Sequence, residues 1–434
     1  MEQRRNFVRC TVPLSRSDTA RGWYTKYQPR VYFQFQPFSI ALVMNRIANL
    51  WYDQNFRHLF FQVLAVLAIA YFGYFLFDNT STNLERLNIK PGFDFMGEIA
   101  GFMPTTDGMN LTGFDLNSST HKDVFIVGIF NTLLLAIVGI ILATILGFIM
   151  GILRLSSNLI ISFISSAYVE GMRNIPLLLW ILIWYFGVIL AGPNVRQSIN
   201  IFDTAFINKR YLAVPQPLYT DAILFLCVGL LIALIAAIFL RNWAKKRLDT
   251  EGKDFPVFLT SAAMFFLIPY ILLVITGNSI SWEFPVLKGF NYINGIQLPA
   301  SYVAMLMALV FYTGAYIAEV VRAGILAVSS GQLDAARSIG LRESQINRFV
   351  VIPQALRVII PPLTSQYLNL TKNSSLAIAI GYTDLVNVFT GISLMQTGNA
   401  LEIIMLTMAF YASVSILISI FMNWFNKHVA IVER

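Results

Sequence analysis

About eight long apolar runs constrain the fold of this chain more than any other feature. Only 12% of its 434 residues are charged, whereas soluble domains average about 25%. A helix that crosses a bilayer needs roughly 20 apolar residues. The runs lie near 59–77, 124–152, 174–191, 222–241, 256–276, 299–323, 355–380 and 402–424. We therefore predict an all-α, polytopic membrane protein with about eight transmembrane helices.

Lysine and arginine residues indicate the orientation of these spans. Residues 1–57 carry nine of them and 241–254 carry five, whereas the 277–298 loop carries only Lys288. Because basic loops stay in the cytoplasm, we expect both termini and the 324–353 loop to be cytoplasmic. The 78–123 loop is then external.

The N-terminal segment before the first span contains a short apolar pattern. Residues 42–51 place Leu42, Ile47 and Trp51 on one helical face. This spacing predicts an interfacial helix on the inner leaflet, although so short a pattern also fits a simple linker.

Cysteine, histidine and net charge exclude several kinds of site. The two cysteines, Cys10 and Cys227, cannot form a disulfide framework. The three histidines are far apart in sequence and none lies deep in a span, so no metal site is predicted. The charge of +8 comes from Lys and Arg at span ends, which favours contact with membrane lipid over nucleic acid. No cofactor is predicted.

The second span carries small residues at helical spacing. Ala143, Gly147 and Gly151 follow one another at four-residue intervals. Small side chains at this spacing let another helix approach closely. The sequence leaves two interpretations open. The stripe either contacts a partner or a moving helix, or it packs against another helix of this chain.

The 324–353 loop begins with a polar segment that is predicted to be helical. Ser329 or Ser330 can cap this helix, and Asp334 is expected in its first turn, where the helix dipole favours an anion. Gly340 can supply the left-handed residue that ends it.

A second helix is expected from about Glu343, and Pro353 is expected to mark the turn into the seventh span. Ala335 and Ala336 give the first helix a flat face that suits insertion into a groove of a partner. The alternative is an amphipathic helix that rests on the membrane.

This loop resembles the EAA loop of binding-protein-dependent ABC importer permeases. Asp334-Ala-Ala, Gly340 and Val350-Val-Ile-Pro353 keep the spacing of that family's Glu-Ala-Ala, Gly and Ile-x-Leu-Pro. Asp334 departs from the family's Glu. The resemblance implies that a partner ATPase docks on the following residues: Asp334, Ala335, Ala336, Gly340 and Pro353.

Four further stretches resemble the polar amino-acid branch of the same family. They begin at Asn131, Tyr168, Ala318 and Thr371, in the family's order. The resemblance implies a type I importer core made of residues 124–191 and 299–434. The remaining segments are a cytoplasmic N-terminal segment (1–58), a first span with an external loop (59–123) and an inserted pair of spans (192–298). This enlarged layout resembles the larger permease subunits of general L-amino-acid transporters.

The function that the resemblance implies is ATP-driven import of L-amino acids by alternating access across a bacterial inner membrane. The implied partners are ABC ATPase subunits, a second, related permease subunit and a periplasmic amino-acid-binding protein. The chain has no Gly-x-x-x-x-Gly-Lys-[Ser/Thr] motif, so another chain must hydrolyse ATP and this one is expected not to be an enzyme.

Two alternatives belong to other classes. A self-sufficient, ion-coupled secondary transporter usually has an internal repeat, and no clear repeat is visible. An intramembrane enzyme needs a clustered acid–base or metal set, whereas the acidic residues here are scattered.

Polar residues inside the predicted spans are candidates for the solute path. The density of polar residues in the seventh span predicts a cavity lining or a broken helix. Lys372 binds a substrate carboxylate or snorkels to the outer headgroups. Glu319 and Arg322 form a substrate-facing pair or a structural ion pair. The candidate path residues are Asn174, Glu319, Asn369, Lys372, Asn373, Ser374 and Ser375.

Overall fold

The computed structural model describes residues 51, 53–86, 92–103, 114–218, 221–252, 255–277 and 281–429. The chain divides into two compact units, Met1–Asn83 and Leu84–Arg434. Helix α2 (Gln54–Arg86) supplies nearly all of the described first unit, and it is long and apolar enough to cross a membrane. The chain ends lie outside the described residues, as does the predicted interfacial helix apart from Trp51.

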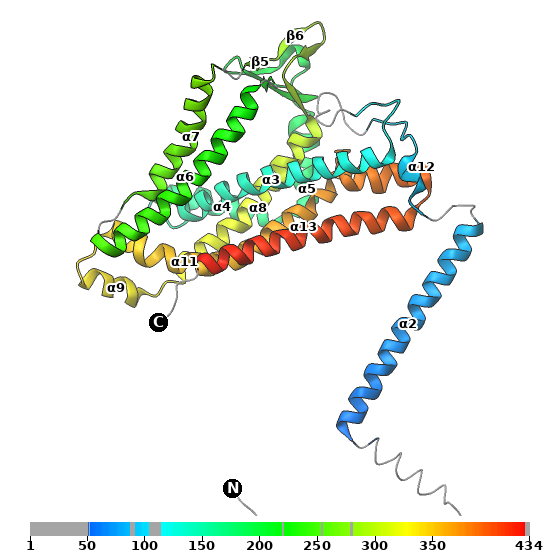
Figure 1. Ribbon diagram of the computed structural model, residues 1–434, viewed down its shortest axis with the longest axis horizontal. Coiled ribbons are helices and arrows are strands. Elements are labelled where there is room, and N and C mark those ends of the chain that lie inside the picture. The colour runs from blue at the N-terminus through cyan, green and yellow to red at the C-terminus, as the bar shows by residue number, and fades with distance from the viewer. Residues whose placement is uncertain are drawn as a thin grey trace, which may run out of the picture. The chain divides into compact units, whose positions relative to one another are not determined.

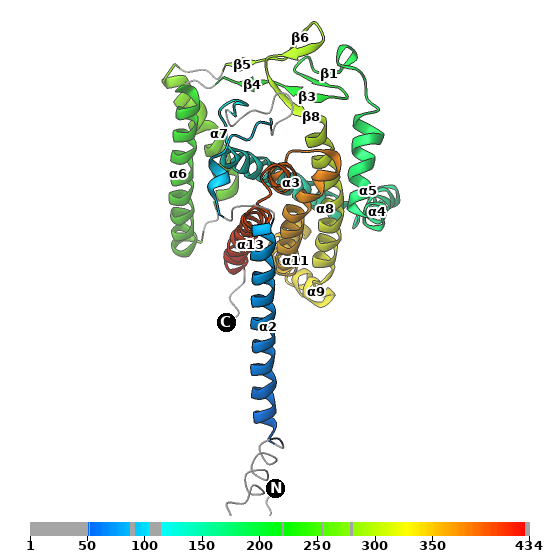
Figure 2. The same ribbon diagram turned by 90° about the vertical axis from the view of Figure 1, so that its right-hand side faces the viewer.

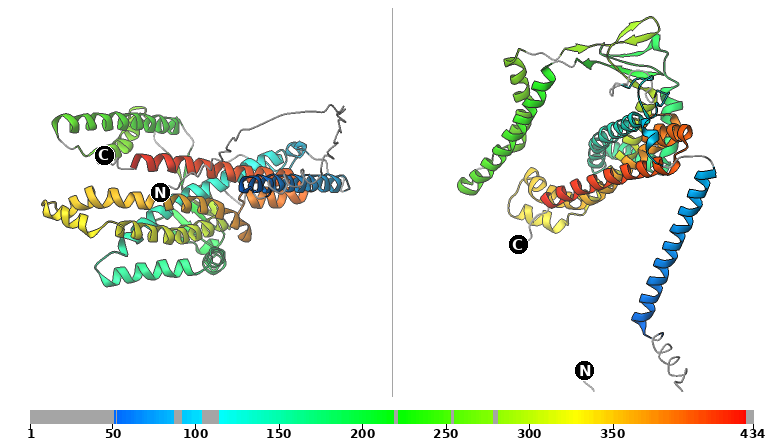
Figure 3. Two further views of the ribbon diagram at one scale, coloured as in Figure 1. Left: turned by 90° about the horizontal axis from the view of Figure 1, so that it is seen from below. Right: turned by 45° about the vertical axis from the view of Figure 1, so that its right-hand side comes forward.

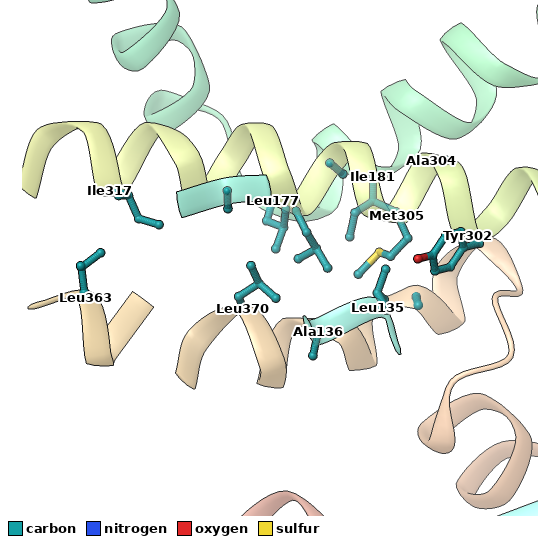
Figure 4. Packing of buried hydrophobic residues seen from close by; sticks show 14 of the residues in the cluster. Leu135, Ala136, Leu177, Ile181, Tyr302, Ala304, Met305, Ile317, Leu363 and Leu370 are labelled. Atoms are coloured by element: carbon teal, nitrogen blue, oxygen red, sulfur yellow. The ribbon is translucent and has the colours of Figure 1, made fainter. Parts of the chain in front are cut away.

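Four long helices form the centre of the second unit (Figures 1 and 2). They are α3 (His121–Leu153), α8 (Ala300–Leu326), α11 (Ile352–Asn373) and α13 (Ala400–Val429). Side chains from α3, α8, α11 and the short helix α5 (Leu177–Leu182) meet in an apolar core (Figure 4). More than half of the residues of α8 are buried, so it is the central helix of the unit.

Helices α3 and α8 touch through the small-residue stripe. A Cβ added to Gly147 would lie 2.5 Å from the Ile317 Cβ, and one added to Gly151 would lie 2.7 Å from the Ala318 carbonyl oxygen. Both distances are shorter than real carbon contacts allow, so only glycine permits this approach. In this structure the stripe serves packing within the chain.

A sharp bend separates α4 (Leu159–Asn174) from α5 and the π-helical η2 (Ile183–Ile189). The axes of the two arms differ by 106°. Asn158 caps α4 by accepting the N–H groups of Ile160 and Ile161, and Pro176 precedes α5. The predicted bend at Asn174 and Pro176 is confirmed, and the predicted third span covers only the second arm.

Helices α6 (Asp221–Glu251) and α7 (Val257–Ile275) form an antiparallel pair (Figure 3). Six helices among the described residues are long and apolar enough to cross a membrane, or seven if the bent pair is one span. Helix α7 is apolar but shorter. The eight-crossing layout and the domain boundaries stay predictions.

Three small antiparallel sheets, which the sequence did not predict, accompany the mainly helical fold. The four-stranded sheet has the order β1-β2-β3-β8, with residue pairs such as Leu212↔Leu298, and β4-β5 and β6-β7 form two separate two-stranded sheets. The strands are β1 (Ile199–Ile201), β2 (Ala205–Ile207), β3 (Tyr211–Val214), β4 (Gln216–Pro217), β5 (Trp282–Glu283), β6 (Val286–Lys288), β7 (Asn291–Ile293) and β8 (Ile296–Pro299). Each strand has at most four residues, too few for a periodic pattern to be recognised in the sequence.

The sheet and the 324–353 loop lie at opposite ends of α8 (Figures 1 and 2). Strand β8 runs directly into α8, and the Ala300 N–H donates to the Arg210 carbonyl at 2.9 Å. The short helices that complete the unit are η1 (Asp94–Gly97), η3 (Val195–Gln197), α9 (Ser330–Ser338), α10 (Glu343–Ile346), η4 (Asn347–Val351), η5 (Ser374–Ile380), η6 (Val386–Ser393) and α12 (Leu394–Thr397).

Candidate coupling loop and solute path

Helix α9 ends in a Schellman turn at Gly340. The Leu341 N–H donates to the Ala336 carbonyl at 3.2 Å, and the Gly340 N–H donates to the Arg337 carbonyl at 2.9 Å. Gly340 has a φ of +80°, a conformation that β-branched residues resist. The predicted left-handed stop is confirmed, and these two backbone bonds close the turn.

Charged side chains brace this turn. Arg337 donates from Nε to the Glu343 Oε1 at 2.9 Å and from Nη1 to the Asp334 Oδ1 at 3.3 Å. Helix α9 begins at Ser330, so Asp334 lies in the second turn and the expectation of a first-turn anion is wrong. The Asp334 side chain is 70% exposed, so a partner can reach it.

The two alanines of the loop do not share a face. Ala336 is buried and Ala335 is exposed, because α9 rests against α10 and η4 along one side. The small Ala336 side chain permits that contact. The outer surface of α9 therefore presents Ala335 and charged residues instead of the predicted pair of alanines.

The chain does not turn at Pro353. Helix α10, the π-helical η4 and α11 follow one another, and residues Glu343–Ile380 form one apolar helical stretch. Pro353 occupies the first turn of α11, where a missing N–H costs little. The second helix of the loop is thus the start of the seventh predicted span, which links the loop directly to α11.

Glu319 forms ion pairs with arginines of three different segments. Arg154, just after α3, bonds the Oε2 of Glu319, and Arg173 of α4 approaches the same oxygen at 3.4 Å. Arg322 reaches the other oxygen at 3.4 Å. Arg154 also approaches Glu170 at 3.4 Å. This cluster lies near the end of α8 that continues into α9, about 10 Å along the helix from its last residue.

One face of α11 is polar and exposed. Ser365, Asn369 and Lys372 follow at helical spacing, and each is exposed, whereas Leu363 and Leu370 on the other side are buried. Within the part of the chain that the structure describes, the side chains of Asn369 and Lys372 make no hydrogen bond or ion pair. Such a stripe within an apolar bundle requires water or another chain to cover it.

Other hydroxyl groups of this stretch bond the backbone of their own helix. The Ser374 Oγ donates to the Thr371 carbonyl and the Ser375 Oγ to the Lys372 carbonyl, both at 2.8 Å. The α-helix ends at Asn373 and tightens into the 3-10 helix η5, which ends at the left-handed Gly381. The polar stretch therefore does not break the span, because its helix tightens after Asn373 and continues as η5.

The structure thus separates the candidate path residues into four groups. Asn369 and Lys372 lie on the exposed stripe, while Asn373, Ser374 and Ser375 lie where η5 begins. Glu319 belongs to the arginine cluster, and Asn174 is exposed at the bend between α4 and α5.

A buried polar cluster around Asp384 was missed in the sequence. Its carboxylate accepts the Asn387 N–H at 3.0 Å, and the Tyr411 hydroxyl approaches it at 3.5 Å. Burial raises the pKa of Asp384 to about 6. The Thr132 hydroxyl accepts the Leu385 N–H at 3.0 Å, so the cluster ties the 381–385 turn to α3. The adjacent Asn131-Thr pair, present in the sequence, was the available signal.

Relatives of this chain are membrane components of transport systems. Residues 229–430 match the family described as binding-protein-dependent transport system inner membrane component. The general L-amino acid transport system permease protein AapQ of Rhizobium johnstonii is 44% identical over 88% of this chain and 94% of its own length. The putative amino-acid ABC transporter permease protein YhdX of Escherichia coli is 43% identical over 86% and 94%.

A third relative gives the same assignment. The glutamate/glutamine/aspartate/asparagine transport system permease protein BztB of Rhodobacter capsulatus is 37% identical over 90% of this chain and 97% of its own length. The three alignments cover most of this chain and most of each relative, so the relatives share its enlarged layout. The chain belongs to the family of binding-protein-dependent transport system inner membrane components, and it is a multi-pass permease subunit with a mainly helical fold.

Proposed function

We propose that this chain is the larger permease subunit of an ATP-driven importer of L-amino acids in a bacterial inner membrane. Its partners are two ABC ATPase subunits, a second, related permease subunit and a periplasmic amino-acid-binding protein. The chain itself carries out no ATP chemistry. The names of its relatives, each an amino-acid permease protein, support the substrate class.

The observation that carries the proposal is the structure of the 324–353 loop. It joins the ends of α8 and α11, two helices of the core, through a turn closed by its own backbone. An ATPase that binds Asp334, Ala335 and neighbouring residues therefore moves α8 and α11 together. Gly340 sets the angle of the turn, and Pro353 lies in the first turn of the helix that transmits the motion.

The exposed stripe on α11 is the proposed solute path of this subunit. A zwitterionic amino acid carries a carboxylate, which the Lys372 ammonium can hold, and amide groups such as Asn369 can bond either end. The second permease subunit closes the path from the other side. Nucleotide binding and release in the ATPases then expose the stripe alternately to each side of the membrane.

Purification of the chain in mild detergent tests the partners. An ABC ATPase and a second permease should co-purify, and the complex in proteoliposomes should import L-amino acids only with ATP inside and the binding protein outside. Uptake by this chain alone, driven by a proton or sodium gradient, would contradict the proposal and establish a secondary transporter.

A further inference from the structure

Two hairpins of the strand region 199–299 each present an exposed phenylalanine at their turn. Phe202 lies between β1 and β2 and is 93% exposed; Phe290 lies between β6 and β7 and is 74% exposed. The first hairpin belongs to the four-stranded sheet and the second is a separate two-stranded sheet, and both lie at the end of α8 opposite the 324–353 loop (Figure 2). If the loop is cytoplasmic, both hairpins stand outside the cell.

The turn that carries Phe202 has an uncommon backbone. Phe202 has a φ of +51° and Asp203 a φ of +53°, and the Thr204 N–H donates to the Ile201 carbonyl at 3.1 Å. This is the geometry of a type I′ turn, which favours Asn-Gly and is strained with a bulky aromatic residue. Asn200 holds the turn by accepting the Asp203 N–H at 2.8 Å. The structure thus keeps a strained residue in place, and that residue exposes its ring to water.

The second hairpin is braced by positive charge. The Arg196 guanidinium stacks on the Phe290 ring at 4.2 Å, and Arg210 donates to the Asn291 side chain at 2.9 Å. The segments 192–218 and 281–299 carry four basic residues against two acidic ones, Asp203 and Glu283. The two segments together therefore carry a net positive charge.

The sheet beneath the hairpins is a folded platform. Tyr211 and Ala213 of β3 are buried together with Tyr292 of β7, and the Tyr211 hydroxyl accepts the Tyr292 N–H at 3.0 Å. Phe206 stacks on Tyr292 with 4.6 Å between ring centroids. The sheet has its own apolar core, so the exposed rings are not needed to complete it.

We infer that the Phe202 and Phe290 hairpins form the docking surface for the solute-binding protein. Exposed aromatic rings that are held rigidly and flanked by arginine are typical of interface anchors. The family depends on a soluble binding protein, and this protein has to meet the permease on the outer side. The net positive charge of the two segments selects an acidic face on that protein. Because β8 continues into α8, a protein docked on the hairpins can shift α8, the helix that leads to the 324–353 loop.

A lipid surface fits these observations less well. The hairpins extend beyond the outer ends of α6, α7 and α8 (Figure 1). A helix that faces lipid presents long stretches of apolar residues, as α7 does. The hairpins instead present single phenylalanine rings next to arginine and lysine side chains.

The inference rests on the proposed function, and the experiment separates the two. The complete importer is reconstituted in proteoliposomes, and its ATPase rate is measured while the amino-acid-loaded binding protein is titrated. If the binding protein does not stimulate the wild-type complex, the proposed function fails. If it does, the Phe202→Gly variant tests the docking surface.

Glycine suits the positive φ at position 202, so this variant relieves strain and should fold at least as well as the parent. We expect the binding-protein concentration for half-maximal stimulation to rise roughly 30-fold, as at an interface anchor. The ATPase rate without binding protein should not change. Phe93→Ser, which alters a half-exposed ring before η1 in the predicted external region outside the sheet, is the matched control and should leave the titration unchanged.

Charge reversal gives a second, independent measurement. Lys209 is exposed beside the sheet, and Lys209→Glu should raise the half-maximal concentration and reduce its dependence on salt. An unchanged titration for both Phe202→Gly and Lys209→Glu overturns the inference. So does a photo-crosslinker at position 202 that captures lipid or a second copy of this chain instead of the added binding protein.

Discussion

The two ends of helix α8 are built in different ways. At its C-terminal end, the turn after α9 is closed by backbone bonds between residues no more than five apart, and its charged groups remain exposed. At its N-terminal end, Leu212 pairs with Leu298 from the far side of the α6–α7 insertion, and the sheet encloses its own core. The C-terminal turn, residues 330–343, is a local bracket with an exposed surface, whereas the sheet at the N-terminal end is a platform that exists only when distant segments pair.

Helix α8 therefore joins two regions that are built differently, and we refer to it below as the rod. Helix α8 is held against α3 by contacts so close that only glycine fits, and it connects the platform to the bracket. A partner that binds at one end of α8 can then affect the other end only if the contact between α3 and α8 persists. The α3–α8 contact, the bracket, the arginine cluster around Glu319 and the buried turn at Asp384 can each be altered separately by substitution.

The largest effect is expected from Gly147→Leu. A side chain at this position meets the Ile317 Cβ and the Gly314 carbonyl, so α3 and α8 must separate. We expect import to be lost and the melting temperature of the purified complex to fall by several degrees. Gly171→Leu is the matched control, because no atom lies within 4 Å of a Cβ there. Retained import in Gly147→Leu would show that the two ends do not need a rigid connection.

Gly340→Val should damage the bracket alone. A β-branched residue at a φ of +80° is strained by about 1–3 kcal/mol, so the turn should open and the ATPase should dissociate. We expect a loss of roughly tenfold or more in co-purified ATPase, with normal membrane insertion. Gly340→Asn should lose less, because asparagine tolerates the left-handed region. Gly331→Ala, in the same loop but outside the turn, serves as control; equal ATPase recovery in all three variants would rule out a docking role for the turn.

The contrast between the ends also explains what the sequence could reveal. The stop at Gly340 depends on one residue type and local capping, so the pattern around Asp334 and Gly340 predicted it. The sheet depends on pairing between residues such as Leu212 and Leu298, and no local pattern in strands of three or four residues signals it.

The candidate site shows the same division. Composition predicted that the polar stretch around Ser374 would line a cavity or break its helix, and the helix changes its hydrogen-bonding pattern there without breaking. The arginines around Glu319 come from three segments, and only the close approach of α3, α4 and α8 brings them together. The Pro353 prediction was wrong because the preceding π-helical η4 lets the helix continue through it.

Glu319→Gln should weaken transmission from the bracket without removing the ATPase. A neutral amide leaves three arginines without their shared carboxylate, so the inner ends of α3, α4 and α8 should move less as one body. Coupling changes of about 0.5–2 kcal/mol are typical, so we expect a several-fold fall in the maximal import rate with an unchanged KM. A raised KM with an unchanged maximal rate would place Glu319 on the solute path instead. Glu170→Gln removes one exposed contact and should have little effect.

The smallest effect is expected from Asp384→Asn, which probes the buried turn near the outer end of α11. Burial raises the pKa of this carboxyl from 3.8 to about 6, so the folded protein binds a proton that the unfolded chain releases between these values. Stability of the parent should therefore fall as pH rises from about 4 to 6 and stay level above. The Asn variant carries no such proton and still accepts the Asn387 N–H through its side-chain carbonyl. Thermal unfolding in detergent across this range should show the variant gaining about 2–4 °C relative to the parent; parallel curves would show that the turn is not held by a protonated Asp384.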